Sequence, residues 1–209
     1  MNKLLKTILS ISLIGGISGQ ATANLITNGG FEEIPTSAAI GGDNSTWFIY
    51  ASSQVNGWEG DNLELWTNRN PDASEGNYHA ELNADGANDD NWSIFQTFDT
   101  VAGKAYSVFF AYSARRGDDT VSSEAFDVTV DGLSWSITDH VKGPWKTFTS
   151  TFIADDNSAT LRFSSVIPYS RTLGNFIDDV RVTDVPAPSA LALLGLGLVS
   201  LRFARKRKI

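Results

Sequence analysis

Residues 105–114 have the sequence Ala-Tyr-Ser-Val-Phe-Phe-Ala-Tyr-Ser-Ala. Successive side chains of an extended strand point to opposite faces of a sheet, so this stretch would place two different sets on the two faces. One face would carry Tyr106, Val108, Phe110 and Tyr112, and the other Ser107, Phe109, Ala111 and Ser113. The stretch therefore predicts a β-strand.

The same alternation recurs on both sides of this strand. Residues 126–130 and 133–137 flank Asp131-Gly132, a pair typical of a two-residue hairpin turn. Further strands are expected at 46–51, 63–66, 78–83, 92–98, 145–153, 159–165 and 175–183. Helical periodicity is nearly absent, so we expect an all-β fold, a single antiparallel jelly-roll β-sandwich, with 34–45 as a flexible insertion.

Charge divides the 209 residues into three parts. All 24 acidic residues lie between Glu32 and Asp184, where only nine basic residues accompany them, and this gives segment 24–185 a net charge of −15. Such an acidic body argues against nucleic acid as a partner. With no cysteine, disulfides and thiol chemistry are excluded. We expect the sandwich at 24–185, between a signal peptide at 1–23 and a sorting tail at 186–209.

The N-terminus has the pattern of a secretory signal peptide. Lys3 and Lys6 precede an apolar stretch that ends in Ala21-Thr22-Ala23, the small residues of a cleavage site. We expect export and cleavage after Ala23. The alternative is an N-terminal membrane anchor.

The C-terminus predicts a short transmembrane helix. Ser189 to Ala204 would form about 24 Å of helix, against a hydrocarbon core about 30 Å thick. Five basic residues from Arg202 to Lys208 would keep its end in the cytoplasm. The alternative, a buried amphipathic helix, fits badly because the run has no polar face.

This order of proline motif, Leu/Gly-rich helix and basic cluster over 185–209 resembles the PEP-CTERM sorting signal of Gram-negative bacteria. The chain has Pro186-Ala187-Pro188 where the name-giving motif has Pro-Glu-Pro. The resemblance implies an exosortase partner that cuts near Pro186 and Pro188, transient anchoring in the inner membrane, and a cell-surface or extracellular location.

The ends of the middle segment carry a second resemblance. Residues 24–32 (Asn-Leu-Ile-Thr-Asn-Gly-Gly-Phe-Glu) and 174–182 (Gly-Asn-Phe-Ile-Asp-Asp-Val-Arg-Val) resemble the opening and closing strands of bacterial carbohydrate-binding modules with a galactose-binding-like jelly roll. Between them, in the expected order, stand Gly57-Trp58, Leu63-Glu64-Leu65-Trp66, residues 76–83, Gln96-Thr97-Phe98 and Trp145-Lys146-Thr147-Phe148. The resemblance implies a sugar ligand and a structural Ca²⁺.

The calcium ligands that we assign are Glu32 and Asp178. The first and last strands of a jelly roll lie close together, and two carboxylates brought together repel unless a cation joins them. Ca²⁺ prefers oxygen ligands of this kind. The alternative is that Glu32 faces water or pairs with Arg181.

The candidate sugar-binding residues are tryptophans with polar neighbours. Exposed tryptophan rings stack on the C–H faces of sugars, although any single tryptophan can equally belong to the core. Trp58 and Trp92 lie in polar loop contexts, and Trp66 could lie near Glu64 and Arg69. Trp145 is interpreted instead as a core anchor at a strand start, and Arg115 with Arg116 as a charged loop tip.

No catalytic site is expected. The sequence has no Gly-x-Ser-x-Gly elbow, P-loop or dinucleotide fingerprint. His79 is expected on a strand, half-buried and hydrogen-bonded, and His140 in a loop. The favoured function is a non-catalytic binding module, secreted or displayed at the cell surface, that recognises polysaccharide. The alternatives are an adhesive matrix component without a specific sugar site, and a hydrolase of unknown type, for which the 24 acidic residues leave a pair of catalytic carboxylates open.

Overall fold

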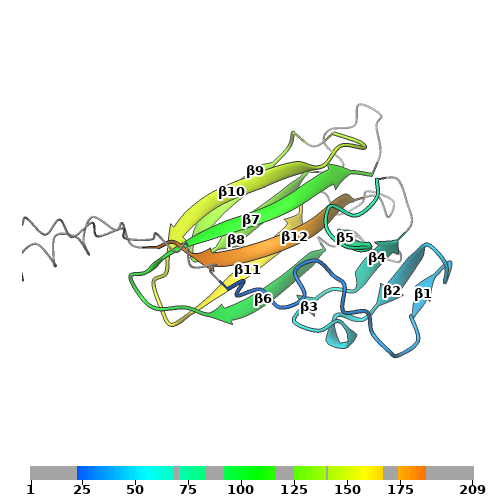
Figure 1. Cartoon of the computed structure of the whole chain (residues 1–209), viewed down its shortest axis with the longest axis horizontal. Helices are drawn as coiled ribbons and strands as arrows, with labels where there is room; N and C mark the ends of the chain where they lie inside the picture. Colours follow the sequence, from blue (N-terminus) through cyan, green and yellow to red (C-terminus); the bar gives the residue numbers. More distant parts are fainter. Residues whose placement is uncertain are drawn as a thin grey trace, which may run out of the picture.

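The computed structural model describes residues 23–67, 71–82, 92–115, 125–139, 141–166 and 174–186. These residues form two antiparallel sheets that stack as a sandwich (Figure 1). The seven-stranded sheet has the order β1 (Gly41–Gly42), β2 (Trp47–Tyr50), β4 (Leu63–Thr67), β5 (Tyr78–Glu81), β12 (Asn175–Asp184), β7 (Ala105–Ala114), β10 (Lys146–Ile153). The five-stranded sheet has the order β3 (Glu59–Gly60), β6 (Ser93–Asp99), β11 (Ser158–Ser165), β8 (Phe126–Val130), β9 (Leu133–Ile137). The all-β sandwich prediction is confirmed.

The core lies between the two sheets. Tyr106, Val108, Phe110 and Tyr112 of β7 are all buried, as the alternation of the sequence predicts. The ring of Phe110 meets that of Phe163 from β11 edge to face, with centroids 5.1 Å apart. Burying such side chains is the main source of stability, at about 25 cal/mol for each Å² of apolar surface removed from water.

The β8–β9 hairpin forms where the sequence predicts it. Val130 pairs with Leu133, and the two turn residues have positive φ angles, 50° at Asp131 and 75° at Gly132. Both central residues of a type I′ turn need this left-handed conformation, which explains the Asp-Gly pair.

The opening segment runs beside the last strand, so the expectation that the two ends of the sandwich meet is confirmed. The Leu25 amide donates to the Val182 carbonyl (2.8 Å), and the Val180 amide donates to the Gly29 carbonyl (2.9 Å). A Cβ on Gly29 would lie 2.0 Å from the Val180 oxygen, so only glycine permits this approach. The register of β12 shifts between Asp178 and Arg181, where Asp179 has a φ of 51°.

Three short elements are not anticipated by the sequence. β1 lies inside the expected insertion 34–45 and pairs with β2. β3 pairs with β6, and a 3-10 helix covers Ser52–Gln54. No helix among the described residues is long and apolar enough to cross a membrane. The signal peptide up to Thr22 and the expected C-terminal helix lie outside the described residues.

Candidate functional site

The outer face of the seven-stranded sheet carries two rows of unusual side chains. Alternate residues of β4 and β5, such as Leu63, Leu65 and Ala80, point into the core. The residues between them therefore point outward. One row of cross-strand partners is Trp47, Trp66 and His79, and the next is Glu64, Glu81 and Phe176.

The rings on this face form a continuous line, which we call the aromatic strip: Trp47, Trp66, Phe176, His79 and Trp145. Successive ring centroids are 6.0, 5.8, 4.5 and 5.5 Å apart. The three inner rings are buried, whereas the two end rings, Trp47 and Trp145, are partly exposed. The indole N–H of Trp145 donates to the carbonyl of Asp72 (2.7 Å), which fixes this ring over the sheet.

Arg115 joins two carboxylates beside the strip. Its Nη1 donates to Oε1 and Oε2 of Glu81 (2.9 and 3.0 Å) and lies 3.9 Å from Oε1 of Glu64. The guanidinium carbon also lies 4.7 Å from the ring centroid of Trp66, in a cation–π arrangement. The Arg115 side chain is 26% exposed, while both glutamates are almost fully buried. Arg115 is therefore part of an ordered cluster, which corrects its interpretation as a loop tip.

Burial raises the pKa of Glu81 well above its usual value, and the charge of Glu64 adds to this shift. Arg115 and the Gly174 amide, which donates to Glu81 Oε1 (2.8 Å), oppose it. Burying two carboxylates costs free energy unless a cation pairs with them, and the partly exposed Arg115 supplies that cation.

His79 is fully buried, which corrects the expectation of a half-buried, hydrogen-bonded ring. Within the described chain neither ring nitrogen has a hydrogen-bond partner. Burial lowers the pKa of His79 to about 4, so the imidazole is neutral at pH 7. His140 lies outside the described residues.

The structure separates the candidate tryptophans. Trp58 is only 2% exposed, donates from its indole N–H to the Asn28 carbonyl (3.1 Å) and stacks on Phe31 at 5.1 Å. It is a core residue, so the expectation of a surface ring was wrong. Trp92 is partly exposed but stands at the start of β6, in the other sheet.

Two of the other candidates fall on the outer face. Trp66 belongs to the aromatic strip and Glu64 to the arginine cluster, although both are buried. Arg69 lies outside the described residues. Trp47, Trp145 and Arg115 are site members that sequence reasoning missed. Trp47 could have been recognised as a candidate because it lies in a predicted strand. Trp145 was passed over because it was interpreted as a core anchor.

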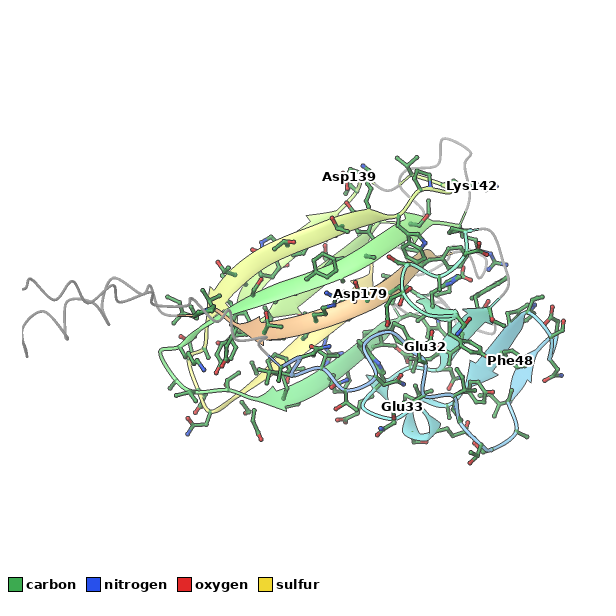
Figure 2. The ribbon with its side chains drawn as sticks, viewed as in Figure 1. Glu32, Glu33, Phe48, Asp139, Lys142 and Asp179 are labelled. Carbon is green, nitrogen blue, oxygen red and sulfur yellow. The ribbon has the colours of Figure 1, made fainter. Side chains whose placement is uncertain are left out.

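Glu32 and Asp178, the expected calcium ligands, both converge on the segment between Ser74 and Tyr78 (Figure 2 labels Glu32). Glu32 Oε1 accepts hydrogen bonds from the amides of Asn77 (2.6 Å) and Tyr78 (2.7 Å). Asp178 accepts from the amides of Glu75 (2.9 Å) and Asp179 (2.7 Å). Both carboxylates thus accept hydrogen bonds from backbone amides. Among the described residues, no group of three or more His, Asp or Glu side chains is close enough together to hold a metal ion.

Asp178 nevertheless has an unbalanced charge. It is fully buried and forms no ion pair in the described structure. Burial raises its pKa to about 7, and the nearby charge of Glu75 contributes. Of the expected processing residues, Ala23 and Pro186 are exposed at the two ends of the described chain, and Pro188 lies outside it.

Comparisons with known proteins divide the chain in two. A family model described as "Protein of unknown function (DUF642)" matches residues 24–183, and the PEP-CTERM protein-sorting motif matches residues 184–208. The second match confirms the resemblance of the tail. The sequence is 27% identical over 196 residues to halomucin of Haloquadratum walsbyi, an alignment that covers 88% of this chain but only 2% of halomucin.

Solved structures with a similar arrangement include carbohydrate-binding modules and parts of glycan-cleaving enzymes, among them an α-L-arabinofuranosidase at a TM-score of 0.45 and 10% identity, covering 78% of this chain and 26% of its own. TmCBM61, solved with β-1,4-galactotriose, has a TM-score of 0.47 at 19% identity and covers 78% of this chain and 100% of its own. A CBM4 module has a TM-score of 0.43 at 18% identity, covering 77% and 99%. CBM35 from Paenibacillus barcinonensis has a TM-score of 0.42 at 18% identity, covering 66% and 98%. At such TM-scores the superpositions are loose, and no binding residue is transferred from them.

Proposed function

The chain belongs to the DUF642 family, whose function is unknown, and we propose that it is an exported, non-catalytic glycan-binding protein of the cell surface. Its sorting motif indicates an exported surface protein. The proposed glycan lies across the outer face of the seven-stranded sheet, along the aromatic strip, and an exosortase cleaves the tail.

The observation that carries this proposal is the placement of Arg115 over the strip. Two buried carboxylates and the face of Trp66 hold the guanidinium in one orientation, and a quarter of the side chain remains exposed. A guanidinium held in this way is preorganised to donate to ligand oxygens. The partly exposed rings of Trp47 and Trp145 offer faces for sugar stacking at the two ends of the strip.

The same geometry argues against hydrolysis at this site. A glycosidase needs two carboxyl groups that reach the scissile bond and a water molecule. Glu81 has both oxygens bonded to Arg115, and the side chains of Glu64 and Glu81 are 2% and 0% exposed. Carboxylates held this deeply support binding without chemistry.

A glycan array probed with the purified chain tests the proposal, followed by titration calorimetry on any glycan that binds. Trp47→Ala and Trp145→Ala should each weaken binding at least about tenfold, because each removes a stacking face worth roughly 1.5 kcal/mol. Trp135→Ala is the matched control, since Trp135 is a partly exposed ring of β9, outside the strip. Melting curves of all three variants show whether the fold survives.

Two results would contradict the proposal. Loss of binding in Trp135→Ala, with both strip variants unaffected, would place the site elsewhere. An array without any binding glycan would favour the alternative of an adhesive matrix component.

A structural Ca²⁺ held by Glu32, Asp178 and backbone carbonyls remains part of the proposal. The buried charge of Asp178, which forms no ion pair with any described residue, and the nearness of Glu75 support it, because a hard cation would neutralise both. The present hydrogen bonds of the two carboxylates to backbone amides would have to give way in part.

A further inference from the structure

Among the described residues the two sheets end in four edge strands, and β10 differs from the other three in its length. β1 and β3 have two residues each, and β9 has five, whereas β10 has eight. Within the described chain β10 pairs with β7 and with no other strand (Figure 1). Exposed edges are templates for further pairing, which proteins usually block with proline, bulges or charges. β10 has an uninterrupted register with β7, and its only charge is Lys146 at its first position.

The backbone groups left unpaired on β10 can be identified. Both backbone groups of Ala154 bond toward β7: its amide donates to the Lys104 carbonyl (3.0 Å), and its carbonyl accepts from Gly103 (2.7 Å). Backbone groups alternate in direction along an antiparallel strand. The amides and carbonyls that face away from β7 are therefore those of Thr147, Thr149, Thr151 and Ile153.

The side chains of this edge suit pairing with an identical strand. Thr147, Thr149 and Thr151 are exposed and uncharged, and Ile153 is 64% exposed, the most exposed of the large hydrophobic residues described. β-branched residues opposite one another stabilise antiparallel pairs.

Charges at the two ends of β10 favour one direction of pairing. Lys142 and Lys146 lie at its start, where Lys146 pairs with Asp139 (2.7 Å) and leaves a net positive charge, and exposed Asp155 and Asp156 follow its end (Figure 2 labels Lys142 and Asp139). Antiparallel pairing of two copies brings the basic end of each strand to the acidic end of the other. Parallel pairing would bring like charges together, so the charges at the two ends of β10 favour the antiparallel arrangement.

We propose that two copies of this chain associate by antiparallel pairing of their β10 strands about a two-fold axis at Ser150. Thr149 then lies opposite Thr151 of the partner subunit, and Thr147 opposite Ile153 of the partner subunit. The seven-stranded sheets become one sheet across the dimer. Because the axis is perpendicular to that sheet, both outer faces point to the same side.

This arrangement would make the proposed glycan binding bivalent, a consequence that rests on the proposed function, whereas the pairing itself does not. An eight-residue edge buries less area than a typical stable interface. The dimer should therefore be weak in solution and should form readily where copies are concentrated at a surface.

Cysteine cross-linking tests the register, because the natural chain has no cysteine. In the full-length chain in mild detergent, Ser150→Cys places two thiols on a non-hydrogen-bonded pair, with Cα atoms about 4.5 Å apart, within disulfide reach. Thr147→Cys is the matched control on the same strand, since its two copies would be roughly 20 Å apart. Mild oxidation should convert most of Ser150→Cys to a dimer and little of Thr147→Cys. Equal cross-linking of both variants would overturn the proposal.

Sedimentation velocity at high protein concentration tests the pairing without any cross-link or glycan. Thr149→Pro removes an outward amide and no bond to β7, so the melting temperature should change little while the dimer is lost. Thr149→Val keeps the amide and should keep the dimer. A monomeric wild-type chain at about 1 mM, or a Thr149→Pro variant that dimerises normally, would refute the pairing. Because no glycan is present, either result leaves the proposed function untouched.

Discussion

Asp178 and His79 are both fully buried, and burial shifts their pKa values in opposite directions. Burial favours the neutral form of each, which raises the pKa of the carboxyl to about 7 and lowers that of the imidazole to about 4. At neutral pH His79 therefore carries no charge, whereas Asp178 is partly ionised, and no described residue forms an ion pair with it. Of the two, Asp178 is the residue at which a bound cation would change stability most.

The stability of the calcium-free chain should fall as the pH rises, through Asp178. The pKa of its carboxyl is 3.8 without the fold, as in the unfolded chain, and about 7 in the folded protein, so the folded state binds the proton more tightly. The resulting stabilisation is complete below about pH 4 and lost as the pH passes 7, and it amounts to at most about 4 kcal/mol. Urea unfolding between pH 4 and 8 measures this slope, and Asp178→Asn should flatten it.

Added Ca²⁺ should restore the unfolding free energy of the wild-type chain at pH 8, and should do so much less in Asp178→Asn. An unchanged free energy in the wild type would count against the calcium site. If the unfolding free energy depends on pH equally in the wild type and in Asp178→Asn, Asp178 is not the group that titrates.

The misplaced tryptophan shows what local sequence conceals. Trp58 has the polar neighbours Asn56, Glu59 and Asp61, all of which are exposed, Asn56 in a turn, Asp61 in a bend and Glu59 in the short strand β3. The ring itself turns inward onto Phe31, since an exposed segment can place a large apolar side chain in the core while its polar residues face water. Composition around a residue predicts the exposure of the segment, and not the direction of one side chain.

At the scale of elements, the long strands could be predicted and the short ones could not. β7 and the β8–β9 hairpin are specified locally, by alternation and by the Asp131-Gly132 turn. β1 and β3 contain only glycine and one glutamate, and they exist because β2 and β6 offer them partners. The bulge of β12 likewise depends on the opening segment packed beside it, which no local pattern describes.

The hairpin turn should depend on the backbone of Gly132 and not on space around it. No atom lies within 4 Å of a Cβ built on Gly132, but its φ of 75° is left-handed. Gly132→Ala should therefore lower the unfolding free energy by about 1 kcal/mol, from backbone strain alone. Gly132→Asn, which tolerates this conformation better, should cost less. Thermal melts compare the two variants, and equal losses would contradict the conformational explanation.

At the scale of the whole molecule, the candidate site is a product of sheet register. The aromatic strip takes residues from β2, β4, β5 and β12 and from Trp145 before β10. Each strand could be predicted singly, but their order across the sheet could not, because it depends on pairings between distant segments. Trp66 and Glu64 were found because they share one strand; Arg115 and Trp47 required the assembled sheet.

Cleavage of the sorting tail should determine whether the sandwich domain is released from the membrane. The family match ends at residue 183 and the sorting motif begins at 184, so cleavage near Pro186 or Pro188 would release the sandwich without cutting β12, which ends at Asp184. Intact-mass measurement of the mature protein should show a chain that begins at Asn24 and ends near Pro188.

Replacing both prolines, Pro186→Ala with Pro188→Ala, should block this processing and leave the protein in the membrane fraction with its tail intact. The matched control is Pro35→Ala with Pro71→Ala, the same chemical change outside the motif, which should be processed normally. Because the substituted prolines follow the last strand, the melting temperature of the sandwich should be unaffected. Normal release of the Pro186→Ala/Pro188→Ala chain would mean that the protease recognises the apolar run and the basic cluster without the prolines.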